Sequence, residues 1–113
     1  MNLNIPEMLA KVKEMQERMG EVHERLRAME VTAEVGGGMV KVRANGKQEL
    51  LSISIEPGVV NPTEIAMLED LVLAAVNRAL EQSRDLAARE LGSATNSMLP
   101  SIPGLDLGSL GLR

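Results

Sequence analysis

Hydrophobic and polar residues alternate in three short runs in the middle of the chain, and this alternation predicts a small β-sheet. The runs are residues 31–35, 40–44 and 51–55, each with a period of two. Three glycines at 36–38 separate the first two runs, and Asn45-Gly46, typical of a type I′ hairpin, separates the second and third. We therefore expect a three-stranded antiparallel meander with one face on a core. So small a sheet needs a cover on its apolar face.

Apolar residues before the sheet recur at spacings of three and four, which predicts a long amphipathic helix. The series follows Pro6, a residue suited to the first turn of a helix. Its members are Met8, Val12, Met15, Met19, Val22, Leu26 and Met29. A helix of about 25 residues extends about 37 Å, which is longer than the sheet can cover. Part of this heptad stripe is therefore expected to pack on the second helix, on a partner subunit, or on both.

A second helix is predicted after the sheet. Asn61-Pro62-Thr63-Glu64 combines a capping residue, proline and a carboxylate, and Gly92 suits the C-terminal stop. At residues 71–76 this helix is apolar nearly all round, so one sheet layer cannot cover it and a subunit interface is indicated. The residues expected at this interface are Val40, Val42, Leu71, Val72, Ala75 and Val76.

Composition divides the chain into a domain of residues 1–92 and a Ser/Gly/Pro-rich tail of residues 93–113. Prolines and glycines exclude a regular helix or a central strand in the tail. It nevertheless keeps aliphatic residues, namely Met98, Leu99, Ile102, Leu105, Leu107, Leu110 and Leu112. Two interpretations stay open: a mobile tail, or a strap lying on an apolar groove.

The residue types that are missing restrict the function. The chain has no Phe, Tyr or Trp, so it lacks the stacking platforms of single-strand binders and common RNA-recognition sheets. The absence of cysteine fits a reducing cytoplasm. His23 is the only histidine, and no residue set has the spacing of a catalytic triad or a metal site, so we expect no enzyme and no cofactor. No signal peptide or membrane span is expected either.

The chain is acidic overall, but some of its basic residues are regularly spaced. The net charge is −4, from 12 basic and 16 acidic residues, so composition alone does not suggest a nucleic-acid partner. Lys11, Arg18 and Arg25 nevertheless form one line along the first helix, spaced about 10 Å apart, which can follow a phosphate backbone. Alternatively, Glu14–Arg18 and Glu21–Arg25 are ordinary helix ion pairs at i,i+4. Such pairs are weak enough for phosphates to displace the glutamates.

Two blocks of residues carry a family resemblance. The first runs from Gly36-Gly37-Gly38-Met39-Val40-Lys41-Val42 through Asn45-Gly46 to Ile55-Glu56-Pro57. The second is Met67-Leu68-Glu69-Asp70-Leu71-Val72 with Ala74-Ala75, Asn77 and Ala79. In this order between two long helices, the blocks resemble the YbaB/EbfC family of bacterial nucleoid-associated proteins. The resemblance covers residues 8–91.

The resemblance implies an α+β fold with a long N-terminal helix, a three-stranded antiparallel meander and a long C-terminal helix, assembled as a tweezer-like homodimer. It also implies binding of double-stranded DNA with little sequence preference, and a cytoplasmic, nucleoid role in nucleoid organisation and gene regulation. DNA binding in the family is associated with the helical arms. The matching cations here are Lys11, Lys13, Arg18, Arg25, Arg27, Arg78, Arg84 and Arg89.

A second class of function fits the same order of elements. A protein-binding scaffold or prefoldin-like chaperone without DNA binding also combines a helix, hairpins and a helix with heptads. It would explain the acidic balance and the apolar tail. Neither reading includes a small-molecule substrate or a membrane partner.

Overall fold

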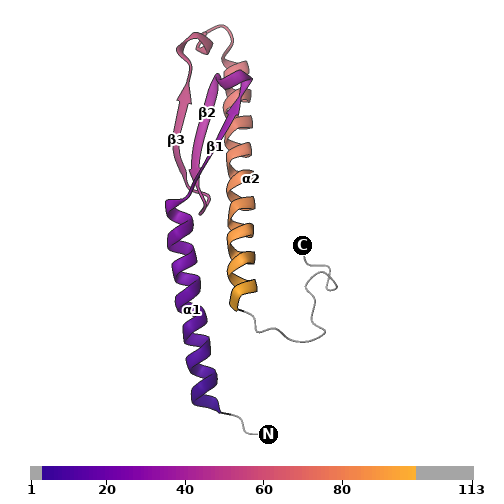
Figure 1. Ribbon diagram of the computed structural model, residues 1–113. Helices are drawn as coiled ribbons and strands as arrows, with labels where there is room; N and C mark the ends of the chain where they lie inside the picture. Colours follow the sequence, from indigo (N-terminus) through magenta and orange to yellow (C-terminus); the bar gives the residue numbers. More distant parts are fainter. Residues whose placement is uncertain (1–3, 99–113) are drawn as a thin grey trace.

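Two long helices and a three-stranded sheet make up the part of the chain that the computed structural model describes, residues 4–98 with side chains to Ala94 (Figure 1). The elements are α1 (Ile5–Ala28), β1 (Glu30–Val35), η1 (Gly36–Gly38), β2 (Val40–Asn45), β3 (Leu50–Ile55), η2 (Pro57–Val59) and α2 (Ile65–Met98). The expected α+β order of helix, meander and helix is confirmed.

The first helix begins where its sequence predicts. The side chain of Asn4 caps it, with Oδ1 accepting a hydrogen bond from the backbone N–H of Glu7 at 3.2 Å, and Pro6 lies in the first turn. The helix has 24 residues and ends where Met29 adopts extended backbone angles. A single residue therefore connects α1 to β1.

The sheet is antiparallel, with β2 between β1 and β3. Its register places Ala33 opposite Val42 and Val42 opposite Ile53, so the alternating apolar residues share one face. The turn η1 joins β1 to β2 through three consecutive glycines with φ of 63°, 68° and 94°. Side chains rarely tolerate that conformation, which explains the glycine triplet.

The turn between β2 and β3 differs from the expected type I′ hairpin. Neither Asn45 nor Gly46 has a positive φ; among the described non-glycine residues that conformation occurs at Gln48, with φ of 62°. The side chain of Asn45 organises the loop instead, since its Oδ1 accepts hydrogen bonds from the N–H groups of Lys47 at 2.9 Å and Glu49 at 3.1 Å. The result is a longer connection over residues 46–49.

Helix α2 packs over β1 and β2 and builds the main core (Figure 1). Ala33, Val42, Ala75 and Ala79 are fully or almost fully buried there, and the alanines allow the helix to approach the sheet closely. The expectation that the apolar positions of β3 are buried in the core is wrong for Leu51 and Ile53, which are 41% and 48% exposed. A helix about 10 Å wide covers about two strands at 4.8 Å spacing, so the third strand lies beyond its edge.

Both ends of α2 differ from the sequence expectation. The side chain of Asn61 accepts hydrogen bonds from the N–H and Oγ1 of Thr63, which makes a separate turn, and the helix begins at Ile65. It also continues past Gly92 to Met98, so the expectation that residues 93–113 contain no regular helix is wrong for residues 93–98. A glycine inside a helix costs only about 1 kcal/mol, and Leu91 beside it packs against α1. Residues 99–113, for which a tail or a strap was expected, lie outside the described residues.

Helix α1 runs antiparallel to α2 and extends beyond its end (Figure 1). Val22 and Leu26 are buried against Leu86 of α2, in a second core cluster. We call residues 5–19 the arm, because the apolar residues at its heptad positions are exposed in the first three turns. The radius of gyration is 20.7 Å, against about 13 Å for a compact domain of about 100 residues. The chain is therefore elongated, with extents of 74 × 28 × 16 Å.

A network of hydrogen bonds fixes the β2–β3 loop between the two helices. The N–H of Gly46 donates to the carbonyl oxygens of Leu26 at 2.9 Å and Met29 at 3.1 Å. The buried Oγ of Ser83 on α2 donates to the carbonyl of Asn45 at 2.6 Å and accepts from the N–H of Gln48 at 3.0 Å. We call these residues the loop clamp. It ties the end of α1, the sheet and α2 into one unit.

Candidate nucleic-acid interface

Three of the five predicted cations on α1 are already in ion pairs. Arg18 contacts Glu14 at 2.8 Å, which confirms that i,i+4 pair. Arg27 lies 3.6 Å from Glu24 and 4.0 Å from Glu49.

The ion-pair partner of Arg25 differs from the one expected. The Arg25 guanidinium contacts Glu90 of α2 at 3.0 Å, whereas the sequence predicted a pair with Glu21. This ion pair crosses between the helices at the base of the arm. Glu90 is 26% exposed and Arg25 is 55% exposed, so the pair contributes at most about 1 kcal/mol and mainly orients the two side chains.

Lys11 and Lys13 have no carboxylate within 4 Å in the part of the chain that the structure describes. Both are exposed and both lie on the arm, where α1 has passed the end of α2 (Figure 1). Residues two apart point to different sides of a helix, so each ammonium group can meet a phosphate separately, without displacing an ion-pair partner.

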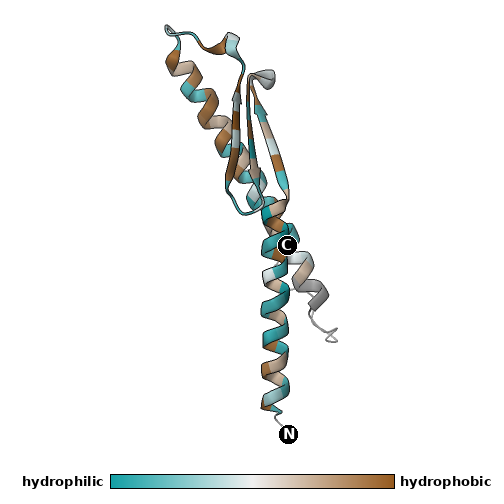
Figure 2. Cartoon of the chain, turned by 90° about the vertical axis from the view of Figure 1, so that its left-hand side faces the viewer, coloured by the Kyte–Doolittle hydropathy of each residue, from teal (hydrophilic) through white to brown (hydrophobic). Residues whose placement is uncertain are grey.

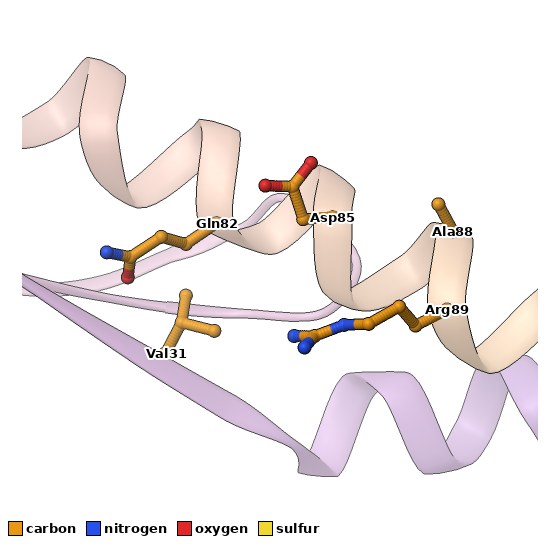
Figure 3. Close-up of a pocket in the computed structure, with 5 residues that line it drawn as sticks. All are labelled: Val31, Gln82, Asp85, Ala88 and Arg89. Carbon is orange, nitrogen blue, oxygen red and sulfur yellow. The ribbon is translucent and has the colours of Figure 1, made fainter. Parts of the chain in front are cut away.

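The three cations predicted on α2 lie in different surroundings. Arg78 donates a hydrogen bond to the carbonyl of Glu34 at 3.0 Å and is thereby held at β1. Arg89 lines an open depression of about 520 Å³ between α2 and β1, together with Val31, Gln82, Asp85 and Ala88 (Figure 3). Arg84 is exposed. Of the eight predicted cations, Lys11, Lys13 and Arg18 lie on the projecting arm.

Other basic residues were not predicted as part of a site. Lys41 and Arg43 form cross-strand pairs with Glu34 and Glu30, each at 3.6 Å, on the exposed face of the sheet. Lys47 in the β2–β3 loop has its Nζ 3.4 Å from Nδ1 of His23 on α1. The turn sequence placed Lys47 in a loop, but no sequence signal brought that loop to α1.

The residues predicted at a subunit interface fall into two groups. Val40, Val42 and Ala75 have no exposed surface, because they belong to the core of the protomer itself. The other three, Leu71, Val72 and Val76, are half-buried. Leu73, which is not among the predicted interface residues but lies in the stretch 71–76 that is apolar nearly all round, is 60% exposed.

No group of three or more His, Cys, Asp or Glu side chains in the described part of the chain is placed to hold a metal ion. No helix there is long and apolar enough to cross a membrane.

The chain is thus a two-layer α+β protein with a helical arm that projects past its body and carries equal numbers of basic and acidic residues. It belongs to the YbaB/EbfC DNA-binding family, whose model matches residues 1–98. This membership confirms the resemblance found in the sequence.

The names of similar proteins are consistent with this family membership. The chain is 46% identical over 102 residues to the nucleoid-associated protein Teth514_0034 of Thermoanaerobacter sp. (strain X514), covering 90% of each. It is 42% identical over 102 residues to a nucleoid-associated protein of Syntrophobacter fumaroxidans, covering 90% of this chain and 91% of that one. The crystal structure of the uncharacterized protein HP0035 from Helicobacter pylori matches with a TM-score of 0.71 at 18% identity, covering 87% and 100% of the two chains. That likeness concerns the fold.

Proposed function

We propose that the chain binds double-stranded DNA as a homodimer, mainly through phosphate contacts from its arms and with little sequence preference. Through this binding it contributes to nucleoid organisation and gene regulation in the cytoplasm. The observation that carries the proposal is the arm itself, which extends past α2 and presents Lys11 and Lys13 with no carboxylate within 4 Å among the described residues. Family membership gives independent support.

The net charge of −4 does not prevent this contact. The molecule is 74 Å long, and the start of α2 with its acidic Glu69 and Asp70 lies at the end opposite to the arm (Figure 1). At an ionic strength of about 0.1 M the Debye length is about 10 Å, so these carboxylates are screened from a phosphate at the arm. On the arm itself three acidic residues, Glu7, Glu14 and Glu17, balance the three basic ones, so the contact depends on how the lysine side chains are placed and not on an excess of positive charge.

Weak sequence preference follows from the chemistry of the available cations. Arginine can read guanine through two parallel hydrogen bonds, but Arg18, Arg25 and Arg27 would first have to leave their glutamate partners, which lowers the net gain from such a contact. The two lysines without such partners act as point charges toward phosphate. Binding of this kind has a typical Kd of about 10⁻⁴ to 10⁻⁶ M at physiological salt. Two arms in one dimer raise the affinity through effective concentration.

An uncovered apolar surface supports the homodimer. Leu73 is 60% exposed and Ile53 is 48% exposed, and the half-buried Val72 and Val76 lie on the same side of α2 as Leu73 by helical spacing. A second copy that covers β3 and this side of α2 would remove these side chains from water.

Replacing Val76 by glutamate is expected to dissociate the dimer, because the interface would bury a carboxylate without a partner. Sedimentation velocity at fixed protein concentration measures the change. The matched control is Ala74→Glu, since Ala74 is exposed and lies on another side of α2 by helical spacing; that variant should stay dimeric. A Val76→Glu protein that remains dimeric and equally stable would place the interface elsewhere.

Reversing the charge of both arm lysines, Lys11→Glu with Lys13→Glu, is expected to weaken DNA binding and flatten its salt dependence. Each lost phosphate contact lowers the slope of log K against log salt by about 0.9, so the expected decrease is about two per protomer. Gel shifts with unrelated duplexes over a range of salt give this slope. The control with the same charge change is Lys41→Glu with Arg43→Glu on the sheet. An unchanged slope in the arm variant would refute the arm as the contact.

The exposed apolar residues of the arm also favour a second candidate, a protein-binding scaffold or prefoldin-like chaperone without DNA binding. The same gel shifts separate the two functions. A scaffold gives no shift with any duplex, at low or at moderate salt.

A further inference from the structure

An apolar stripe runs along the arm and is exposed to solvent. Its members Ile5, Met8, Val12 and Met15 are between 48% and 61% exposed. Hydrophobic colour recurs along this projecting part of α1 in Figure 2. The same heptad series continues into Val22 and Leu26, which pack on α2. The stripe is thus the continuation of the α1–α2 contact past the end of α2.

The register of the two helices shows how much of the stripe lies beyond α2. Arg25 contacts Glu90 across the antiparallel pair. Met98, the last residue of α2, follows Glu90 by eight residues and is therefore roughly level with Glu17, eight residues before Arg25, because both helices rise about 1.5 Å per residue. About 12 residues of α1, or about 18 Å, remain beyond that level.

The chain itself continues from this point. Residues 99–113 follow Met98, and 15 residues span at most about 50 Å. That reach is more than twice the length of the uncovered stripe. The segment is tethered where the stripe begins, which gives it an effective concentration in the millimolar range, well above that of a second molecule at micromolar concentration.

The composition of the segment matches the stripe. It contains Leu99, Ile102, Leu105, Leu107, Leu110 and Leu112, and its charged side chains are Asp106 and Arg113. Pro100 and Pro103 have no backbone N–H that an apolar surface would leave unpaired. On the other side, the methionines of the stripe are unbranched and adapt to irregular aliphatic partners.

We propose that residues 99–113 form a strap that binds the exposed stripe, Ile5, Met8, Val12 and Met15, on the arm of the same chain. The strap is an intramolecular docking of aliphatic side chains, and it does not depend on DNA binding. The alternative occupants, a second copy of the chain or another protein, are separate outcomes of the test below.

The lack of native cysteine allows a clean cross-linking experiment on the full chain. The test variant carries Val12→Cys with Leu105→Cys; the matched control carries Lys13→Cys with Leu105→Cys. Residue 13 is one position further but about 100° round the helix, away from the stripe. In a glutathione redox buffer, the intramolecular disulfide of the test pair is expected to form at an effective thiol concentration roughly tenfold higher than that of the control pair. Mass spectrometry and non-reducing gels quantify it.

Two results would overturn the strap. Equal disulfide formation in both pairs would show that residues 99–113 do not favour the stripe. A disulfide that joins two chains in the test pair would place a second copy on the stripe instead.

Methionine oxidation gives a second readout without cysteines. The full chain is compared with a variant in which Leu105, Leu107 and Leu110 are replaced by serine. Met8 and Met15 are expected to react several-fold faster with hydrogen peroxide in the variant, because the strap no longer shields them. Met67 on α2, 45% exposed, is the internal reference and should react equally in both. Equal rates at Met8 and Met15 in the two proteins would contradict the strap.

Discussion

Replacing Leu26 by alanine is expected to lower the free energy of unfolding by about 2–5 kcal/mol. Leu26 is 1% exposed and belongs to the cluster with Val22 and Leu86 that joins α1 to α2. Its side chain also contacts the loop clamp next to Gly46, so the cavity opens where three elements meet. Neighbouring backbone is held there by hydrogen bonds and cannot collapse fully into the space.

The control for this variant is Leu9→Ala on the same helix. Leu9 is 64% exposed and lies off the heptad stripe, so its truncation should change the free energy of unfolding by less than about 0.5 kcal/mol. Urea unfolding followed by circular dichroism measures both variants. Protein concentration is kept constant because the apparent stability of the proposed dimer would depend on it. Equal stabilities of the two variants would contradict the packing of α1 on α2.

Replacing Gly46 by alanine is expected to cost about 1–3 kcal/mol, through overpacking of the loop clamp. A Cβ at this position would lie 2.8 Å from both the carbonyl oxygen and Cδ2 of Leu26. The side chain could rotate away, but the carbonyl accepts the hydrogen bond from the N–H of Gly46 and is fixed by it. Relief therefore requires the loop to move away from α1.

The same chemical change at Gly20 is expected to have the opposite sign. A Cβ there would meet no atom within 4 Å, and alanine is favoured over glycine inside a helix by about 1 kcal/mol. Thermal and urea unfolding of the two variants, run side by side, test the pair. A Gly46→Ala protein as stable as the Gly20→Ala protein would show that the loop is not clamped.

The periodic elements could be predicted from the sequence because each rests on local residues. The alternation in residues 31–35 and 40–44 identified β1 and β2, and the heptad series from Met8 to Met29 identified α1, which the structure bounds at Ile5–Ala28. The prediction of a type I′ turn at Asn45-Gly46 was wrong because an Asn-Gly pair is compatible with more than one turn conformation. The choice depends on Ser83, which lies 38 residues away and bonds the carbonyl of Asn45.

The sequence predicted that candidate cations lie along α1, but it did not predict the ion-pair partner of Arg25. Glu21 and Glu90 offer Arg25 ion pairs that differ by only a few tenths of a kcal/mol, so the packing of α1 on α2 decides the partner. Similarly, the alternation in β2 showed that Val40 and Val42 face an apolar layer. It did not show whether that layer belongs to the same chain, because the width of α2 sets which strands it covers.

The connection between α1 and β1 has a mechanical consequence. Met29 alone joins them, and its carbonyl, like that of Leu26, is bonded to the loop between β2 and β3. These hydrogen bonds restrict rotation of α1 relative to the sheet. The helix, about 36 Å long, therefore keeps a fixed orientation. In the proposed dimer, the spacing between the two α1 helices would be fixed by these junctions before a DNA duplex binds. The protein would then not have to spend binding energy on aligning its arms.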